Sequence, residues 1–182
     1  MGCFASRVHE SDGELAQLQE LLDTSYAAAG EHLLSIHRPG RRLNAREVSE
    51  RLVGMCLLAL ATVTADGRPI VGPVDGIFYR AAFYFGSAPN SLRFRHIRRR
   101  PQVSATHVPG EHLAVTVHGR AVPIDLHGEV AAGVRQTLLD VYVPRYGPDW
   151  EQFLDSGPIY ACIEPYRMFA FYAPELSPAS SS

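Results

Sequence analysis

The chain has 182 residues, of which 46% are hydrophobic and 20% charged, a balance typical of one soluble globular domain. A net charge of −2 and a pI near 6.4 give no overall field that would hold nucleic acid. No segment approaches the roughly 18 consecutive apolar residues of a membrane helix, and we expect neither a membrane partner nor a signal peptide. Cys3, Cys56 and Cys162 form no CxxC motif, so we expect reduced thiols in a cytoplasmic protein, without a disulfide framework or a zinc ribbon.

The first 54 residues have the pattern of a helical extension packed on the rest of the chain. Ser11 and Glu14 form an S-x-x-E capping box in front of leucines at helical spacing, which predicts a helix from this point. Asn44 and Glu47 repeat the same signal. We expect this second helix to end at Gly54, because glycine takes the positive φ that often terminates a helix. Between the two helices, residues 37–42 contain proline and glycine and are predicted to form a loop.

From residue 55 onward the sequence changes to short apolar runs separated by turn residues, which is typical of β-strands. Helices are predicted for 91–100, which Pro101 ends, and for 127–142, where apolar residues recur at helical spacing. The predicted strands are 55–64, 69–78, 82–85, 102–107, 112–122, 159–163 and 166–172.

Six or seven mostly sequential strands predict a mainly β fold. We expect a small antiparallel barrel over 55–172, with a helical insertion at about 124–156 and a flexible tail at 173–182.

The densest chemical signal is the stretch 87–101, in which hydroxyl groups and arginines gather around the start of a predicted helix. Ser87 and Ser91 precede Arg93, and the free backbone N–H groups of the helix N-terminus would lie beside them. The helix dipole, these donors and the guanidinium fork together suit a phosphate monoester. The alternative is a solvated basic helix face without a ligand.

The same stretch stands within an ordered series of motifs. They are A-T-x-x-x-D-G-x-P in the first hairpin, V-x-P-V in the second strand, S-x-R in the helix and V-x-V-x-G-x-A in a later strand. The matching residues are Ala61, Thr62, Asp66, Gly67, Pro69, Val71, Pro73, Val74, Phe85, Ser87, Ser91, Arg93, Pro101, Val115, Val117, Gly119 and Ala121.

In their order and spacing these motifs resemble the flavin-binding split β-barrel family, the superfamily of pyridoxamine 5′-phosphate oxidase, over about 55–122. The resemblance implies a six-stranded antiparallel split barrel and a homodimer with FMN at its interface. It also implies an oxidoreductase that transfers hydride between the flavin and a small-molecule substrate.

The resemblance also implies which residues bind the cofactor. Ser87, Ser91 and Arg93 correspond to the phosphate ligands, and His96, one helical turn after Arg93, is a further candidate. The second-strand segment that would line the flavin ring, through shape and backbone hydrogen bonds, consists of Val71, Gly72, Pro73 and Val74. No residue is assigned to catalysis, and no metal ion is expected.

Two departures from the family pattern leave the substrate open. The oxidase has an R-x-R-L-x-P-type segment for its substrate, whereas Arg167 is the only arginine in the corresponding part of this chain. Ala114 stands where many flavin-binding members have a glutamine. The sequence therefore does not support pyridoxamine phosphate as the substrate.

Other cofactors stay open as alternatives. The deazaflavin coenzyme F-420 has an acidic tail that would need further cations, and heme, the less favoured of the two, would need an axial histidine. A protein that binds flavin or heme without turnover is also an alternative. The residues that could serve are Arg38, Arg41, Arg42 and Arg46 for the acidic tail, and His107 or His118 for heme.

Asp75 directly follows the ring-lining segment. It could reach the ring or a substrate, or it could be a strand-end residue that pairs with an arginine such as Arg80, and we favour the pairing. The aromatic residues of the insertion are expected to pack it against the barrel, and one or two of them could instead cover the ring. These residues are Tyr142, Tyr146, Trp150 and Phe153.

Overall fold

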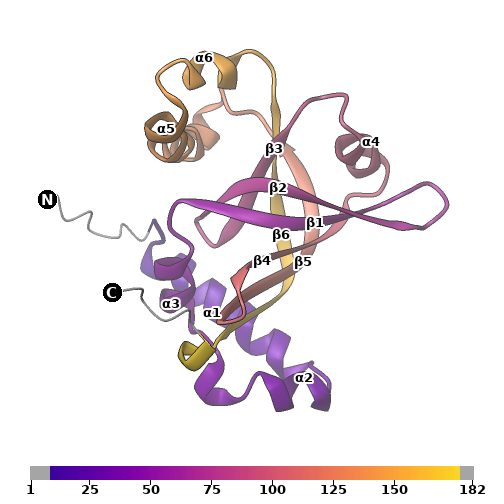
Figure 1. The fold of residues 1–182 in the computed structure, drawn as a ribbon, viewed down its shortest axis with the longest axis vertical. Coiled ribbons are helices and arrows are strands. Elements are labelled where there is room, and N and C mark those ends of the chain that lie inside the picture. Colours follow the sequence, from indigo (N-terminus) through magenta and orange to yellow (C-terminus); the bar gives the residue numbers. More distant parts are fainter. Residues whose placement is uncertain (1–8, 177–182) are drawn as a thin grey trace, which may run out of the picture.

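A computed structural model describes residues 9–176 of the chain, so Cys3 and the last six residues of the predicted tail lie outside the described residues. Its centre is a closed barrel of six strands in the order β1-β2-β3-β6-β5-β4 (Figure 1). Every neighbouring pair is antiparallel. The predicted split-barrel fold is confirmed. Among the described residues, no helix is long and apolar enough to cross a membrane.

The strands lie close to their predicted positions. They are β1 (Met55–Val63), β2 (Pro69–Tyr79), β3 (Ala82–Ser87), β4 (Gln102–Gly110), β5 (Leu113–Ile124) and β6 (Ile159–Tyr172). The two C-terminal segments predicted separately form the single strand β6, because a register shift beside Gly119 of β5 absorbs one extra residue. A Cβ atom at Gly119 would lie 2.4 Å from the carbonyl oxygen of Glu164, so this close approach requires glycine.

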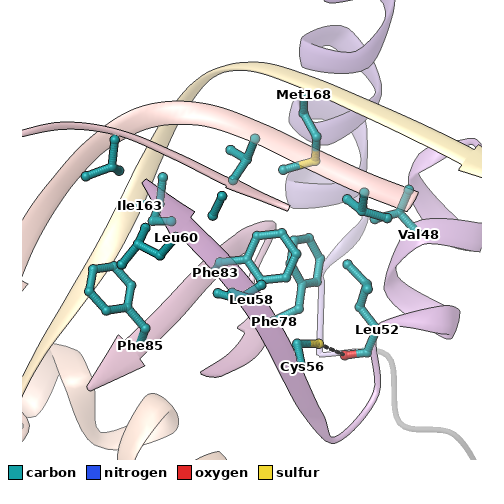
Figure 2. Packing of buried hydrophobic residues seen from close by; sticks show 14 of the residues in the cluster. Val48, Leu52, Cys56, Leu58, Leu60, Phe78, Phe83, Phe85, Ile163 and Met168 are labelled. Carbon is teal, nitrogen blue, oxygen red and sulfur yellow. Dashed lines mark hydrogen bonds between the residues drawn. The ribbon is translucent and has the colours of Figure 1, made fainter. Parts of the chain in front are cut away.

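The barrel core contains the inward-facing side chains of all six strands. Figure 2 shows Leu58 and Leu60 of β1 beside Phe83 and Phe85 of β3, with Met168 of β6 above them. Along β1 buried and less buried positions alternate, as expected for a strand with one face on the core. A second apolar cluster joins the outside of β2 and β6 to the insertion, and its members include Ile77, Leu138, Tyr142 and Tyr160.

The helices are grouped toward the two ends of the barrel (Figure 1). They are α1 (Asp12–Ala27), α2 (Glu31–Ile36), α3 (Ala45–Arg51), α4 (Leu92–Arg99), α5 (Ala132–Tyr146) and α6 (Trp150–Asp155), with short 3-10 turns at Pro39–Arg41, Glu129–Ala131 and Pro174–Leu176.

Local capping signals located helix starts better than helix ends. Both predicted capping boxes form, at Ser11 and at Asn44. The prediction that the second helix continues to Gly54 was wrong: α3 ends at Arg51, and Gly54, with φ of 83°, turns the chain into β1. Helix α5 begins five residues later than predicted and ends four residues later. Helix α2 ends just before the predicted loop at 37–42, which contains the 3-10 turn Pro39–Arg41.

Helix α1 completes the wall of the barrel along β6. Strand β3 pairs only with residues 159–162 of β6, so the rest of that edge has no strand beside it. Side chains of α1 take the place of a strand: the Ser25 hydroxyl accepts a hydrogen bond from Met168 N at 2.9 Å. The Tyr26 hydroxyl accepts from Ala170 N at 3.1 Å and donates to Ala170 O at 2.9 Å. The N-terminal extension is therefore hydrogen-bonded into the barrel.

These contacts predict that Tyr26→Phe destabilises the fold. The substitution removes the acceptor of the Ala170 N–H at a buried position, and an unpaired buried donor costs about 1–3 kcal/mol. Urea unfolding followed by circular dichroism measures the loss. Tyr146→Phe, at a side chain that is 57% exposed, is the matched control and should be neutral. Equal stabilities of the two variants would contradict this role of Tyr26.

Candidate functional site

The predicted phosphate ligands lie in the connection from β3 to α4. Ser91 caps α4, and its hydroxyl oxygen accepts a hydrogen bond from Phe94 N at 3.4 Å. The first turn of a helix leaves its N–H groups without intrahelical acceptors, which here concerns Leu92 and Arg93. The Ser91 hydroxyl can still donate its own proton. Three donors are thus available at the N-terminus of α4.

Arg93 joins this helix to the second strand. Its Nη2 atom donates a hydrogen bond to the carbonyl oxygen of Pro73 at 2.8 Å, and a Cβ atom at Gly72 would lie 3.7 Å from the same nitrogen. Burial lowers the pKa of Arg93, while the negative charge of Asp75 raises it. Since an arginine remains charged in proteins, the guanidinium places a positive charge directly against the segment 71–74.

The structure therefore brings the candidates from the second strand and the helix together, but their side chains differ in orientation. Val71 is 65% exposed and Pro73 is also exposed, so both can face a ligand. Val74 is buried in the barrel core and can contribute only its backbone. His96 has its Nδ1 atom 2.9 Å from the hydroxyl of Thr62, a contact that fixes α4 on β1.

Ser87 lies at the end of β3, opposite Ile159 of β6, and lines a cavity of about 450 Å³. The other walls come from β2, from the loop before α4 and from the insertion. They include Asp75, Pro89, Trp150, Phe153 and Tyr160. A Cβ atom at Gly86 would lie 2.5 Å from the Tyr160 ring, so glycine at this position allows the ring to close the cavity.

Sequence reasoning left the roles of Asp75 and the insertion undecided. The favoured pairing of Asp75 with Arg80 was wrong, because Arg80 Nε lies 2.7 Å from a carboxylate oxygen of Glu14. Trp150 stacks on Tyr142 with 4.7 Å between ring centroids, as expected for packing, and also lines the cavity. Tyr160 was missed, since nothing in its local pattern distinguishes it from a core residue.

A larger cavity, of about 1150 Å³, lies elsewhere. It is formed by residues 52–55, at the start of β1, and by residues 139–145 of α5, with His9 and Glu10 at its side. None of the predicted cofactor ligands lines it. Its size therefore does not make it the candidate site.

The residues considered for other cofactors have structural partners. Arg41 pairs with Glu175, and Arg42 donates to His37 O at 2.7 Å. They belong to the segment between α2 and α3, at the end of the barrel away from α4 (Figure 1).

Each of the two candidate axial histidines has a hydrogen-bond contact at Nδ1, which does not involve Nε2, the other ring nitrogen that can bind iron. The Nδ1 atom of His107 lies 2.9 Å from Leu57 O, and that of His118 lies 2.8 Å from the hydroxyl of Ser104. Within residues 9–176, no group of three or more His, Cys, Asp or Glu side chains is arranged to hold a metal ion.

The donor set near α4 fits the phosphate of a flavin mononucleotide. The helix N-terminus, the Ser91 hydroxyl and the Arg93 guanidinium are groups that can form charge-assisted hydrogen bonds to a dianion, and no carboxylate takes part in the hydrogen bonds of Ser91 or Arg93. Arg93 contacts Pro73, and Val71 and Pro73 are the exposed residues of the segment 71–74. A flavin ring on this segment would therefore lie next to the arginine proposed for its phosphate.

Comparison with known proteins identifies the family. The pyridoxamine 5'-phosphate oxidase family matches residues 45–149, more than half of the chain. The chain therefore belongs to this family. Among curated proteins there is no match.

Solved structures share the fold at low sequence identity. A conserved hypothetical protein from Mycobacterium tuberculosis is 18% identical, with a TM-score of 0.62 over 80% of this chain and 96% of that one. The heme storage protein HutZ from Vibrio cholerae is 20% identical, with a TM-score of 0.53 over 63% and 85%. An FAD-binding protein from Mesorhizobium loti is 22% identical, with a TM-score of 0.52 over 73% and 97%. The chain spans about half (52%) of a further similar structure, a protein of unknown function from Agrobacterium tumefaciens.

His118, on the outer face of β5, makes the stability of the barrel depend on pH. Burial, together with the positive charge of Arg167, lowers the pKa of His118 from its ordinary value. The unfolded chain therefore binds this proton more readily, and stability is lost as the pH falls from about 6.5 toward the lower folded pKa.

We expect the urea midpoint to fall between about pH 7.5 and about pH 5, and to fall less in His118→Gln. Part of the fall in the urea midpoint that remains in His118→Gln comes from His37, because burial also lowers the pKa of that side chain. An unchanged pH dependence in His118→Gln would show that this histidine titrates alike in the folded and unfolded states.

Proposed function

We propose that the protein is an FMN-dependent oxidoreductase whose cofactor phosphate binds at the N-terminus of α4. The observation that carries this proposal is the contact of Arg93 with the Pro73 carbonyl, which places a guanidinium between the helix start and the exposed part of β2. Membership of the pyridoxamine 5'-phosphate oxidase family supports the same site.

Each residue has a role in binding. The Leu92 and Arg93 N–H groups and the Ser91 hydroxyl donate to phosphate oxygens, and the Arg93 guanidinium neutralises their charge. Ser87 supplies a further hydroxyl from the end of β3. His96 keeps α4 in position through Thr62, and its second ring nitrogen stays available to the phosphate.

The remainder of the site orients the ring. A bound flavin supplies the hydride chemistry, and the protein supplies position and water exclusion, so no strongly acidic or basic catalytic side chain is required. Val71 and Pro73 present exposed apolar surface to a ring, and the backbone between them offers hydrogen bonds. Aromatic residues of α6 shield the adjoining cavity from water.

We further propose that two copies of the chain associate through the outer face of β1 and β2. Leu57 and Val71 are 56% and 65% exposed on this face, because Ala61, the residue opposite Val71, lies on the same side of β1 as Leu57. The residues between them on β1, Ala59 and Ala61, are small and would allow close approach of a second sheet. Because this patch borders the segment 71–74, a partner copy would cover the ring.

Arg93→Ala should weaken FMN binding by about tenfold or more, since hydrogen bonds to charged groups contribute about 1.5–3 kcal/mol each. Titration of the purified protein with FMN, followed by flavin fluorescence, measures the change. Arg99→Ala removes a charge from the same helix nearly two turns further from its start and should have little effect.

Two results would contradict the phosphate assignment. Equal losses in Arg93→Ala and Arg99→Ala would mean a diffuse basic surface, and riboflavin binding as tightly as FMN would mean that the phosphate is not recognised. A visible spectrum of the isolated protein distinguishes flavin, with two bands, from a deazaflavin or heme, each of which has its own single dominant band.

The proposed dimer should bury more than about 2,000 Å² in total, as permanent apolar interfaces do. Sedimentation velocity at micromolar concentration should give about twice the chain mass of 20.0 kDa. Val71→Asp, which places a charge in the patch, should shift the protein toward the monomer. A wild-type monomer at that concentration would refute the dimer.

A further inference from the structure

The cavity beside Ser87 contains one charged side chain, Asp75. The rest of its lining is aromatic, small or hydroxylated. Asp75 projects from the outer side of β2, two residues after Pro73, and therefore on the same side of the strand. The carboxylate thus borders both the cavity and the proposed flavin site.

This carboxylate is not neutralised by an ion pair. The ion pairs formed by residues 9–176 do not include Asp75. Arg80, the expected partner, binds Glu14, and Arg93 donates to a backbone carbonyl. Asp75 is therefore the one formal charge among the residues that line the cavity, and the Arg93 guanidinium outside this lining is near enough to interact with it.

Two phenols beside Asp75 stay protonated. Burial, reinforced by the negative charge of Asp75, raises the pKa of Tyr142 and of Tyr160 well above the ordinary value. Neither phenol can therefore become a second anion near neutral pH. The Asp75 carboxylate is therefore the group of the lining that favours a cationic ligand over an anionic one.

The aromatic walls favour the same kind of ligand. Trp150, Phe153 and Tyr160 surround the space next to the carboxylate, and aromatic faces attract organic cations. A volume of about 450 Å³ accommodates a molecule of the size of a substituted benzene ring. An anionic or phosphorylated substrate would instead place a second negative charge beside Asp75.

We propose that Asp75 makes this cavity selective for substrates that carry an ammonium group on an apolar or aromatic body. The inference rests on the proposed function, because the cavity shares Ser87 with the FMN site and would hold the substrate next to the cofactor. Asp75 binds the ammonium group, and the rings of α6 and β6 contact the apolar part. Arg93 remains committed to the cofactor phosphate.

The chain contains a single tryptophan, Trp150, so its fluorescence reports directly on this cavity. The test titrates the full-length protein at neutral pH with three probes of nearly equal shape: phenethylammonium, the neutral 2-phenylethanol and the anion phenylacetate. Phenethylammonium should bind about tenfold more tightly than the alcohol, and phenylacetate should bind most weakly.

Asp75→Asn keeps the shape of the side chain and removes its charge. It should weaken phenethylammonium binding about tenfold and leave 2-phenylethanol binding unchanged, which also shows that the cavity is still folded. Glu111→Gln, at an exposed turn residue, is the control for general charge and should change neither. Equal affinities for the ammonium and the alcohol, or an Asp75→Asn variant that binds phenethylammonium normally, would overturn the proposal.

A parallel FMN titration separates this inference from the proposed function. Loss of phenethylammonium selectivity with normal FMN binding would refute only the role of Asp75. Selective ammonium binding in a protein that does not bind FMN would refute the proposed function and leave a cation-binding cavity.

Discussion

The unequal lengths of two neighbouring strands determine much of this structure. Strand β3 has six residues and β6 has fourteen, so most of one edge of β6 has no strand beside it. Unpaired backbone groups are costly in a buried position, and a barrel is stable only when they find other partners. Ser25 and Tyr26 provide these partners from α1, and Glu14 ties the same helix to the β2–β3 turn. The N-terminal extension is thus part of the barrel wall.

The other end of β3 determines the position of the candidate site. The strand stops at Ser87, and the chain leaves the barrel to begin α4 at the Ser91 cap. The N-terminus of α4 therefore lies next to β2, and Arg93 is close enough to contact Pro73. The insertion packs over the same end through Ile77 and Tyr142 and brings α6 beside Ser87. One pocket thus combines residues that are up to 85 positions apart, from Asp75 to Tyr160.

Local signals predicted a large part of this arrangement. The capping boxes at Ser11 and Asn44, the strand runs and the ordered motifs were sufficient for the barrel and for the connection from β3 to α4 that carries Ser87 and Ser91. Helix ends were predicted less well, because the place where a helix stops depends on what it packs against. The orientation of Val74 toward the core follows from its position in the strand. Only the closed barrel shows that this side chain is buried and that Val74 can offer the ring no more than its backbone.

The sequence alone determined most of the strand content and the capped helix starts at Ser11, Asn44 and Ser91, because these depend on interactions between residues a few positions apart. Only the tertiary structure decided the surroundings of Asp75. Arg80 follows it closely in sequence, but the β2–β3 turn, with positive φ at Arg80 and Ala81, directs that arginine toward α1. Trp150 and Tyr160 reach Asp75 instead, because the closed barrel and the packed insertion bring these distant segments to one place.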